Sequence, residues 1–158
     1  MSSRKDEVVK ANADNASGQK LPRLTKARRA ALDLLFEAEA RGLDAIELVD
    51  DRVAHPVSEK LIRDYTIEIV KGVTENRERI DELLATYSTG WPVERMPGVD
   101  RQALRMGIWE MLFNDEIPDN VAIDEAVTAV AEMSTDESPN FVSGLLNRIK
   151  DLKPALID

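Results

Sequence analysis

The residues of this chain best suited to chemistry form a basic cluster near its start. Five basic side chains and no acidic one lie in the stretch KLPRLTKARR, from Lys20 to Arg29. Lysine and arginine hold phosphate oxygens by charge, and arginine also stacks on unpaired bases. At the start of a helix such cations oppose the backbone dipole, at roughly 0.3–1 kcal/mol each. An anionic ligand such as RNA would explain why they are there.

The charge of the chain is unevenly distributed. Residues 1–29 carry eight basic and three acidic side chains, a net charge of +5, while the remaining residues carry 13 and 27, a net charge of −14. A basic arm on an acidic body favours local anion binding over a general affinity for polyanions. Residues 1–21 lack apolar periodicity and are predicted to be disordered. A solvated tail without a ligand is the alternative.

Signs of catalysis are absent from the sequence. There is no cysteine, and the single histidine, His55, precedes a proline in a predicted loop. No glycine-rich phosphate loop, nucleophile elbow or HExxH zinc motif occurs. Acidic pairs such as Asp50–Asp51 are predicted on solvent faces or near helix starts, where acids favour the dipole. We therefore expect no enzyme, no cofactor and no metal.

No targeting or membrane-spanning segment is predicted. The first residues lack the apolar core of a signal peptide, and no stretch approaches the ~20 apolar residues of a membrane span. A cytoplasmic protein without membrane contact is expected.

The elements that position the basic cluster are predicted to be helical, because apolar residues recur at helical spacing after Pro22. The first helix is expected to start at an N-cap Thr25 and to end at Gly42. Thr74 and Ser138 are expected to cap two later helices. About seven helices in an all-α bundle are predicted, the others over about 44–53, 58–72, 99–113 and 121–133.

The first helix has two predicted faces. One stripe should face the core, made of Ala27, Ala31, Leu34, Leu35 and Ala38. Leu32 and Phe36 form a flanking stripe, with Arg28 and Arg29 on either side. Gly107 and Gly144, each inside a later helix, predict close helix–helix approach.

Four segments recur in a known order: RRAALDLLFEAE, PGVDRQALRMGIWEML, IPDNVAIDEAV and DESPNFVSGLLNRI. In order and spacing, over residues 24–149, they resemble the NusB family of transcription antitermination factors. The most specific are the P-x-x-V-A-I-[ND]-E-A run at 118–126 and the S-x-x-F-V-x-G-[VL]-L run at 138–146. The first half is most similar to actinobacterial members.

The resemblance implies a helical domain over 22–155, with two small packed bundles at about 24–74 and 75–153. It implies a non-enzymatic factor that binds boxA, a short single-stranded RNA element, together with the ribosomal protein NusE. Such factors join NusA, NusG and RNA polymerase and support processive transcription of ribosomal RNA operons.

The resemblance also places site residues. RNA binding is expected at Arg23, Lys26, Arg28, Arg29, Phe36 and Glu137, and partner contact at Asp100. Asp100 has a second reading as an N-cap, and Phe36 has one as a partly buried residue. Ser143, where Asn is usual, and Ala131, where Lys is common, depart from the family pattern, as does the smaller number of arginines in the N-terminal run.

An alternative function is a protein–protein adaptor or homodimer with minor, unselective RNA binding. An exposed stripe of Leu32 and Phe36 would then bury against NusE or a second copy of the chain. An RNA methyltransferase is excluded, because the sequence has no strand–glycine loop–helix unit for S-adenosylmethionine.

Overall fold

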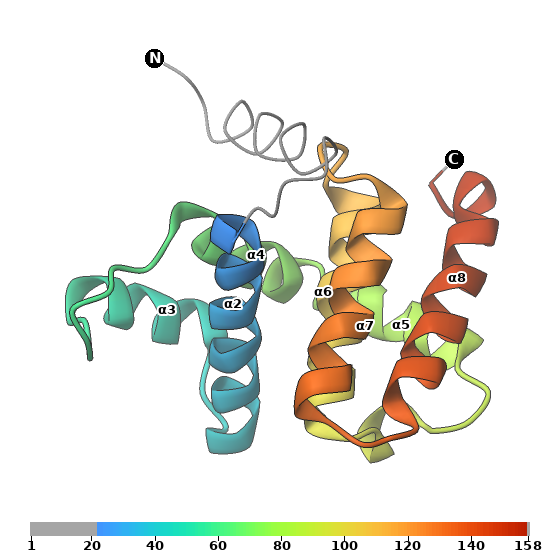
Figure 1. Ribbon diagram of the computed structural model, residues 1–158, viewed down its shortest axis with the longest axis horizontal. Helices are drawn as coiled ribbons and strands as arrows, with labels where there is room; N and C mark the ends of the chain where they lie inside the picture. The colour runs from blue at the N-terminus through green and yellow to red at the C-terminus, as the bar shows by residue number, and fades with distance from the viewer. Residues whose placement is uncertain (1–21, 158) are drawn as a thin grey trace. The chain divides into compact units, whose positions relative to one another are not determined.

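The computed structural model describes residues 22–157, and its regular elements in that range are helical (Figure 1). The predicted all-α fold with about seven helices is confirmed. The predicted arm at residues 1–21 lies outside the described residues. The helices are α2 (Pro22–Arg41), α3 (Ala45–Ala54), α4 (Asp64–Glu75), α5 (Arg77–Tyr87), α6 (Gly98–Phe113), α7 (Asp119–Met133) and α8 (Ser138–Leu156), with a 3-10 turn η1 (Val93–Arg95).

The chain divides into two compact units, residues 1–74 and 75–158. Helices α2, α3 and α4 belong to the first unit, apart from the last residue of α4, and α5 to α8 belong to the second. None of the helices between residues 22 and 157 has the length and hydropathy that a membrane span requires.

The core of the first unit follows the predicted stripe of α2. All five of its residues are buried: Ala27, Ala31, Leu34, Leu35 and Ala38. The hydroxyl of Thr66 on α4 donates a buried hydrogen bond of 2.9 Å to the carbonyl oxygen of Ala27. α2 ends at Arg41, and Gly42 follows it with a φ of +66°, a conformation that glycine adopts without steric cost.

The starts of α2, α4 and α5 differ from the prediction. α2 begins at Pro22 rather than after Thr25, since proline at the first helical position gives up no hydrogen bond. α4 begins at Asp64 rather than Ser58, and Leu61 is 77% exposed in the preceding loop. The Thr74 hydroxyl donates back to the carbonyl of Val70 within α4 instead of capping α5.

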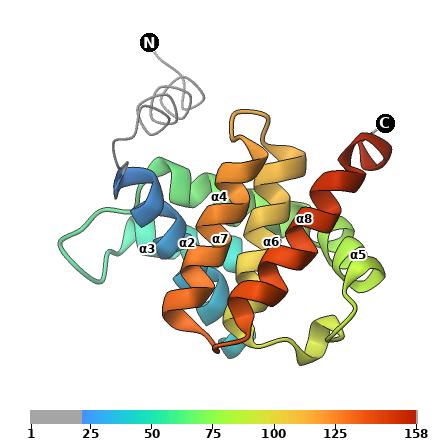
Figure 2. The ribbon, with the colours of Figure 1, turned by 45° about the vertical axis from the view of Figure 1, so that its right-hand side comes forward.

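The second unit is built around α6, which is buried along most of its length and contacts α5, α7 and α8. α7 and α8 also pack against each other (Figure 2). A Cβ atom at Gly107 would lie 2.9 Å from Cδ1 of Leu146, so this glycine permits the predicted close approach of α6 and α8. Gly144 does not have this role, because a Cβ atom there would meet nothing within 4 Å.

Candidate nucleic-acid interface

The outward face of α2 carries part of the predicted RNA-binding set. Lys26 is exposed, Arg29 is half-buried and the ring of Phe36 is 44% exposed. Their spacing of three and seven residues places them on one side of the helix. We call these three residues the basic face of α2. It combines two cations with an aromatic ring, which are the groups that hold single-stranded nucleic acid.

Arg28 points elsewhere, and its predicted exposure is wrong. Its side chain is only 5% exposed, and its guanidinium carbon lies 5.9 Å from the ring centre of Tyr65 on α4. A step of one residue turns a helix by 100°, which carries Arg28 toward the core while Arg29 faces outward. Arg28 therefore acts inside the first unit, through a cation–π contact and packing of its stem.

Of the two residues in the predicted partner-binding stripe, one is buried. Leu32 is 1% exposed and belongs to the core, so its expected exposure is wrong. Phe36 is the member of that stripe which the structure leaves accessible. The side chain of Arg23 lies outside the described part of the chain, although its backbone belongs to the first turn of α2.

A carboxylate lies within the basic face. Partial burial raises the pKa of Asp33 above its ordinary value, and the nearby positive charge of Arg29 acts in the opposite direction. An RNA phosphate that approaches Arg29 thus competes with Asp33. Lys26, one helical turn earlier, is more exposed than Arg29 and is therefore more accessible to a phosphate.

Asp100 occupies a buried position in the second unit. Its exposure is 0%, so neither direct partner contact nor capping describes it, and the residue at the N-cap of α6 is Pro97. Its Oδ2 accepts a hydrogen bond of 2.8 Å from the hydroxyl of Ser138 at the start of α8. Asp100 therefore ties the first turn of α6 to the first turn of α8.

Glu137 is exposed beside that bond. It occupies the N-cap position of α8, one residue before the predicted cap Ser138, and its side chain makes no capping hydrogen bond. The structure thus brings Glu137 and Asp100 to one end of the second unit, through Ser138. The basic face of α2 belongs to the first unit.

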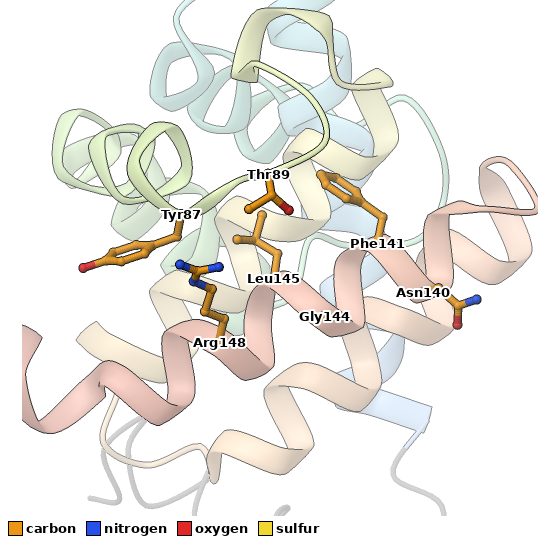
Figure 3. A pocket seen from close by; sticks show the side chains of 7 residues that line it. All are labelled: Tyr87, Thr89, Asn140, Phe141, Gly144, Leu145 and Arg148. Carbon is orange, nitrogen blue, oxygen red and sulfur yellow. The ribbon is translucent and has the colours of Figure 1, made fainter.

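Sequence reasoning missed a hollow in the second unit. It has a volume of about 280 Å³ and lies between the end of α5 and α8 (Figure 3). Tyr87 and Arg148, which line it and lie in cation–π contact, are 61 positions apart, so no local spacing indicates their contact. Gly144 was the available signal, because an exposed glycine within a helix costs about 1 kcal/mol relative to alanine.

Acidic side chains do not gather into a metal site in the described part of the chain, where no group of three or more potential ligands occurs.

Comparison with known sequences gives the family. The sequence model of the NusB family matches residues 25–151. This chain belongs to the NusB family. The transcription antitermination protein NusB of Beutenbergia cavernae is 53% identical over 141 residues, which cover 84% of this chain and 92% of that protein. The NusB protein of an Arthrobacter species is 52% identical over 132 residues, which cover 84% and 96%.

Solved NusB structures share the fold. NusB of T. maritima superposes with a TM-score of 0.70 at 31% identity, covering 80% of this chain and 89% of that one. A complex of NusB and NusE with double-stranded RNA gives a TM-score of 0.69 at 24% identity, covering 80% and 95%. The resemblance found in the motifs is confirmed, and the chain is a non-enzymatic antitermination factor.

Proposed function

We propose that this NusB-family protein binds boxA single-stranded RNA together with NusE and so supports processive transcription of ribosomal RNA operons. It would work in the cytoplasm in a larger assembly with NusA, NusG and RNA polymerase. Similar proteins named as antitermination factors support this proposal, and a NusB of the same fold solved with NusE and double-stranded RNA supports its NusE and RNA parts.

The basic face of α2 is the observation that carries the RNA part of the proposal. Lys26 and Arg29 follow the basic residues of the arm directly, while the rest of the chain is strongly acidic. Cations hold phosphates without reading sequence, and Phe36 offers a surface on which one base can stack. The acidic body repels RNA elsewhere, which restricts binding to this face and the arm.

The burial of Leu32 weakens the alternative proposal of a protein–protein adaptor. It needed an exposed apolar stripe, and the burial of Leu32 leaves Phe36 alone on that flank. A single exposed ring is a small part of the roughly 800 Å² per partner that a stable interface buries. Light scattering of the free protein decides between monomer and homodimer.

Fluorescence anisotropy with boxA RNA and a scrambled RNA, each with and without NusE, tests the proposal. The double variant Lys26→Ala/Arg29→Ala should weaken boxA binding at least about tenfold, because each cation lost removes a charge-assisted contact. Loss of two phosphate contacts should also reduce the salt slope by about 1.4 for a single strand.

The matched control is Lys60→Ala/Lys150→Ala, which removes two exposed charges that do not belong to α2. It changes the net charge equally and should leave the affinity nearly unchanged. Equal binding of both RNAs by the wild-type protein would overturn the boxA proposal. Equal losses in the two double variants would show that only net charge matters.

A further inference from the structure

One segment of the first unit leaves several apolar side chains in solvent. It runs from the last turn of α3 into the loop before α4, and every residue from 53 to 61 is exposed. We call residues 53–61 the exposed segment; in Figure 1 it leaves α3 at the left margin. Val53 is 46% exposed, Val57 78% and Leu61 77%. Single exposed aliphatic residues are ordinary, but three within one short segment indicate a surface that a partner covers.

The fold of the first unit gains little from these side chains. Full burial of a valine or leucine side chain is worth about 1.5–3 kcal/mol, yet Val57 and Leu61 keep most of their surface in water. The hydrogen bonds found in the segment are local. The backbone N–H of Lys60 donates to the hydroxyl of Ser58 at 3.3 Å, and that of His55 donates to the carbonyl of Asp51 at 2.7 Å. Packing of the first unit therefore does not explain the aliphatic residues of the segment.

Carboxylates accompany the exposed segment on α3 and within the loop. Residues 44–61 carry five acidic and two basic side chains, a net charge of −3. Asp50 contacts Lys71 and Asp51 contacts His55, but the two carboxylate side chains remain 59% and 65% exposed. Asp51 also lies in the last turn of α3, where a carboxylate opposes the helix dipole at roughly 0.3–1 kcal/mol. A cationic partner would explain that cost.

We propose that the exposed segment docks a basic protein segment that also carries apolar side chains. The apolar side chains of the partner bury against Val57 and Leu61, while its lysines or arginines pair with the carboxylates of Asp50, Asp51 and Glu59. RNA and an anionic membrane carry the same sign of charge as this surface and are disfavoured. A second copy of the chain is disfavoured as well, because a two-fold contact here would set one acidic surface against another.

The docking surface shares no residue with the basic face of α2. It therefore adds a protein contact to an RNA-binding factor and does not replace the RNA site. The inference rests on the proposed function, because the partner is sought in the antitermination assembly.

Photo-crosslinking from position 57 identifies the occupant. p-Benzoylphenylalanine replaces Val57 in the full chain, which is then assembled with NusE, boxA RNA, NusA, NusG and RNA polymerase. Mass spectrometry after irradiation should find a crosslink to a protein segment with an excess of lysine and arginine. Its yield should fall about fivefold or more when Asp50→Asn/Asp51→Asn is added or the salt is raised, since both weaken the attraction between the charges. The same photo-reactive residue in place of the exposed Ile157 is the control and should not give this product.

Val57→Ser/Leu61→Ser tests the apolar part of the contact. It should weaken association of the complex of this chain, NusE and boxA with the rest of the assembly at least about tenfold, measured by biolayer interferometry, because burial of two aliphatic side chains is lost. Both residues are exposed, so circular dichroism should show an unchanged thermal midpoint.

Two variants outside the exposed segment are matched controls. Ile157→Ser removes another exposed aliphatic side chain, and Asp115→Asn/Asp124→Asn removes two other exposed carboxylates. Both should associate with the assembly as wild type does. Affinity for boxA with NusE should be the same in the test and control variants, since neither set touches the basic face of α2.

The possible results separate the inference from the proposed function. Wild-type association by Val57→Ser/Leu61→Ser overturns the inference, as does a crosslink to RNA, to a second copy of the chain or to an acidic segment, or the absence of a crosslink. The proposed function stands in each of these cases if the wild-type protein selects boxA. Failure of the wild-type protein to select boxA refutes the proposed function, and the inference with it.

Discussion

Consecutive residues of an α-helix point about 100° apart, and on α2 this separates two identical side chains. Arg29 is half-buried on the outward side, whereas Arg28 is buried against Tyr65. A buried guanidinium is costly unless its donors and its charge are compensated. Arg28 has a cation–π partner and further contacts, so it contributes to the stability of the first unit.

Replacement of Arg28 is expected to affect folding more than binding. Arg28→Ala should lower the free energy of unfolding by about 2 kcal/mol, the value of a desolvated cation–π contact, with lost packing of the stem in addition. Urea denaturation followed by circular dichroism measures this loss. Lys26→Ala is the control and should be nearly neutral for stability. RNA affinity of Arg28→Ala, measured where it is fully folded, should stay within about threefold of wild type, which is below 1 kcal/mol.

The opposite result would return Arg28 to the RNA site. Suppose that Arg28→Ala unfolds at the same urea concentration as wild type and still loses as much RNA affinity as Lys26→Ala/Arg29→Ala. In that case Arg28 contacts RNA directly, and its burial against Tyr65 does not describe the RNA-bound protein.

At the scale of elements, the hydrogen bond between Ser138 and Asp100 joins two helix starts. Oδ1 of Asp100 has no hydrogen-bond partner among the described residues, while its Oδ2 accepts the hydrogen bond from the Ser138 hydroxyl. Unsatisfied buried charges are costly. This bond therefore stabilises the packing of α8 on α6.

Ser138→Ala should lower the free energy of unfolding by about 1–3 kcal/mol, because it leaves the buried Asp100 carboxylate without that donor. Asp100→Asn should cost less, since it removes the charge and keeps an acceptor oxygen. Chemical denaturation measures both. Ser143→Ala on the same helix, where the hydroxyl takes part in a local contact with Asn147, is the control. Equal stability of Ser138→Ala and wild type would contradict this role.

Glu37 links α2 to α3 and makes the first unit sensitive to acid. Hydrogen bonding to Arg52, and then to Arg41, lowers the pKa of Glu37 from its ordinary 4.5. A lowered folded-state pKa means that this stabilisation is complete above pH 4.5 and is lost as the pH falls through the lower value. Glu37→Gln lacks it at every pH.

The stability difference between wild type and Glu37→Gln should therefore be present at neutral pH and shrink steadily as the pH falls below 4.5. Urea denaturation over a pH series measures it. Glu59→Gln, an exposed loop substitution, serves as the control and should show no such trend. A difference that is constant across the series would show that the ion pairs contribute nothing.

The exact starts of several helices could not be predicted from the sequence. Thr25, Thr74 and Ser138 were all predicted as caps, and each lies within a helix instead. A hydroxyl side chain bonds equally well to a backbone N–H at a cap, to a carbonyl one turn back or to a distant carboxylate. Tertiary partners decide between these, and they are remote in sequence.

For the whole molecule, the fold was predictable and much of the site was not. Helical spacing and family motifs together predict an all-α NusB fold, because burial of an apolar stripe is a property of many residues at once. The position of a single arginine or leucine on the flank of that stripe depends on one neighbour, such as Tyr65, 37 positions after Arg28. Residues near the edge of a face are therefore where the predictions for Arg28 and Leu32 were wrong.

The contrast between Arg28 and Arg29 has a consequence for genetics. Loss of either arginine should reduce antitermination in a cell, so a screen would recover both and place them in one site. Their alleles differ in kind: an Arg28 allele lowers the amount of folded protein and should be temperature-sensitive, whereas an Arg29 allele leaves abundance unchanged at every temperature. Growth at low temperature would restore the first and not the second.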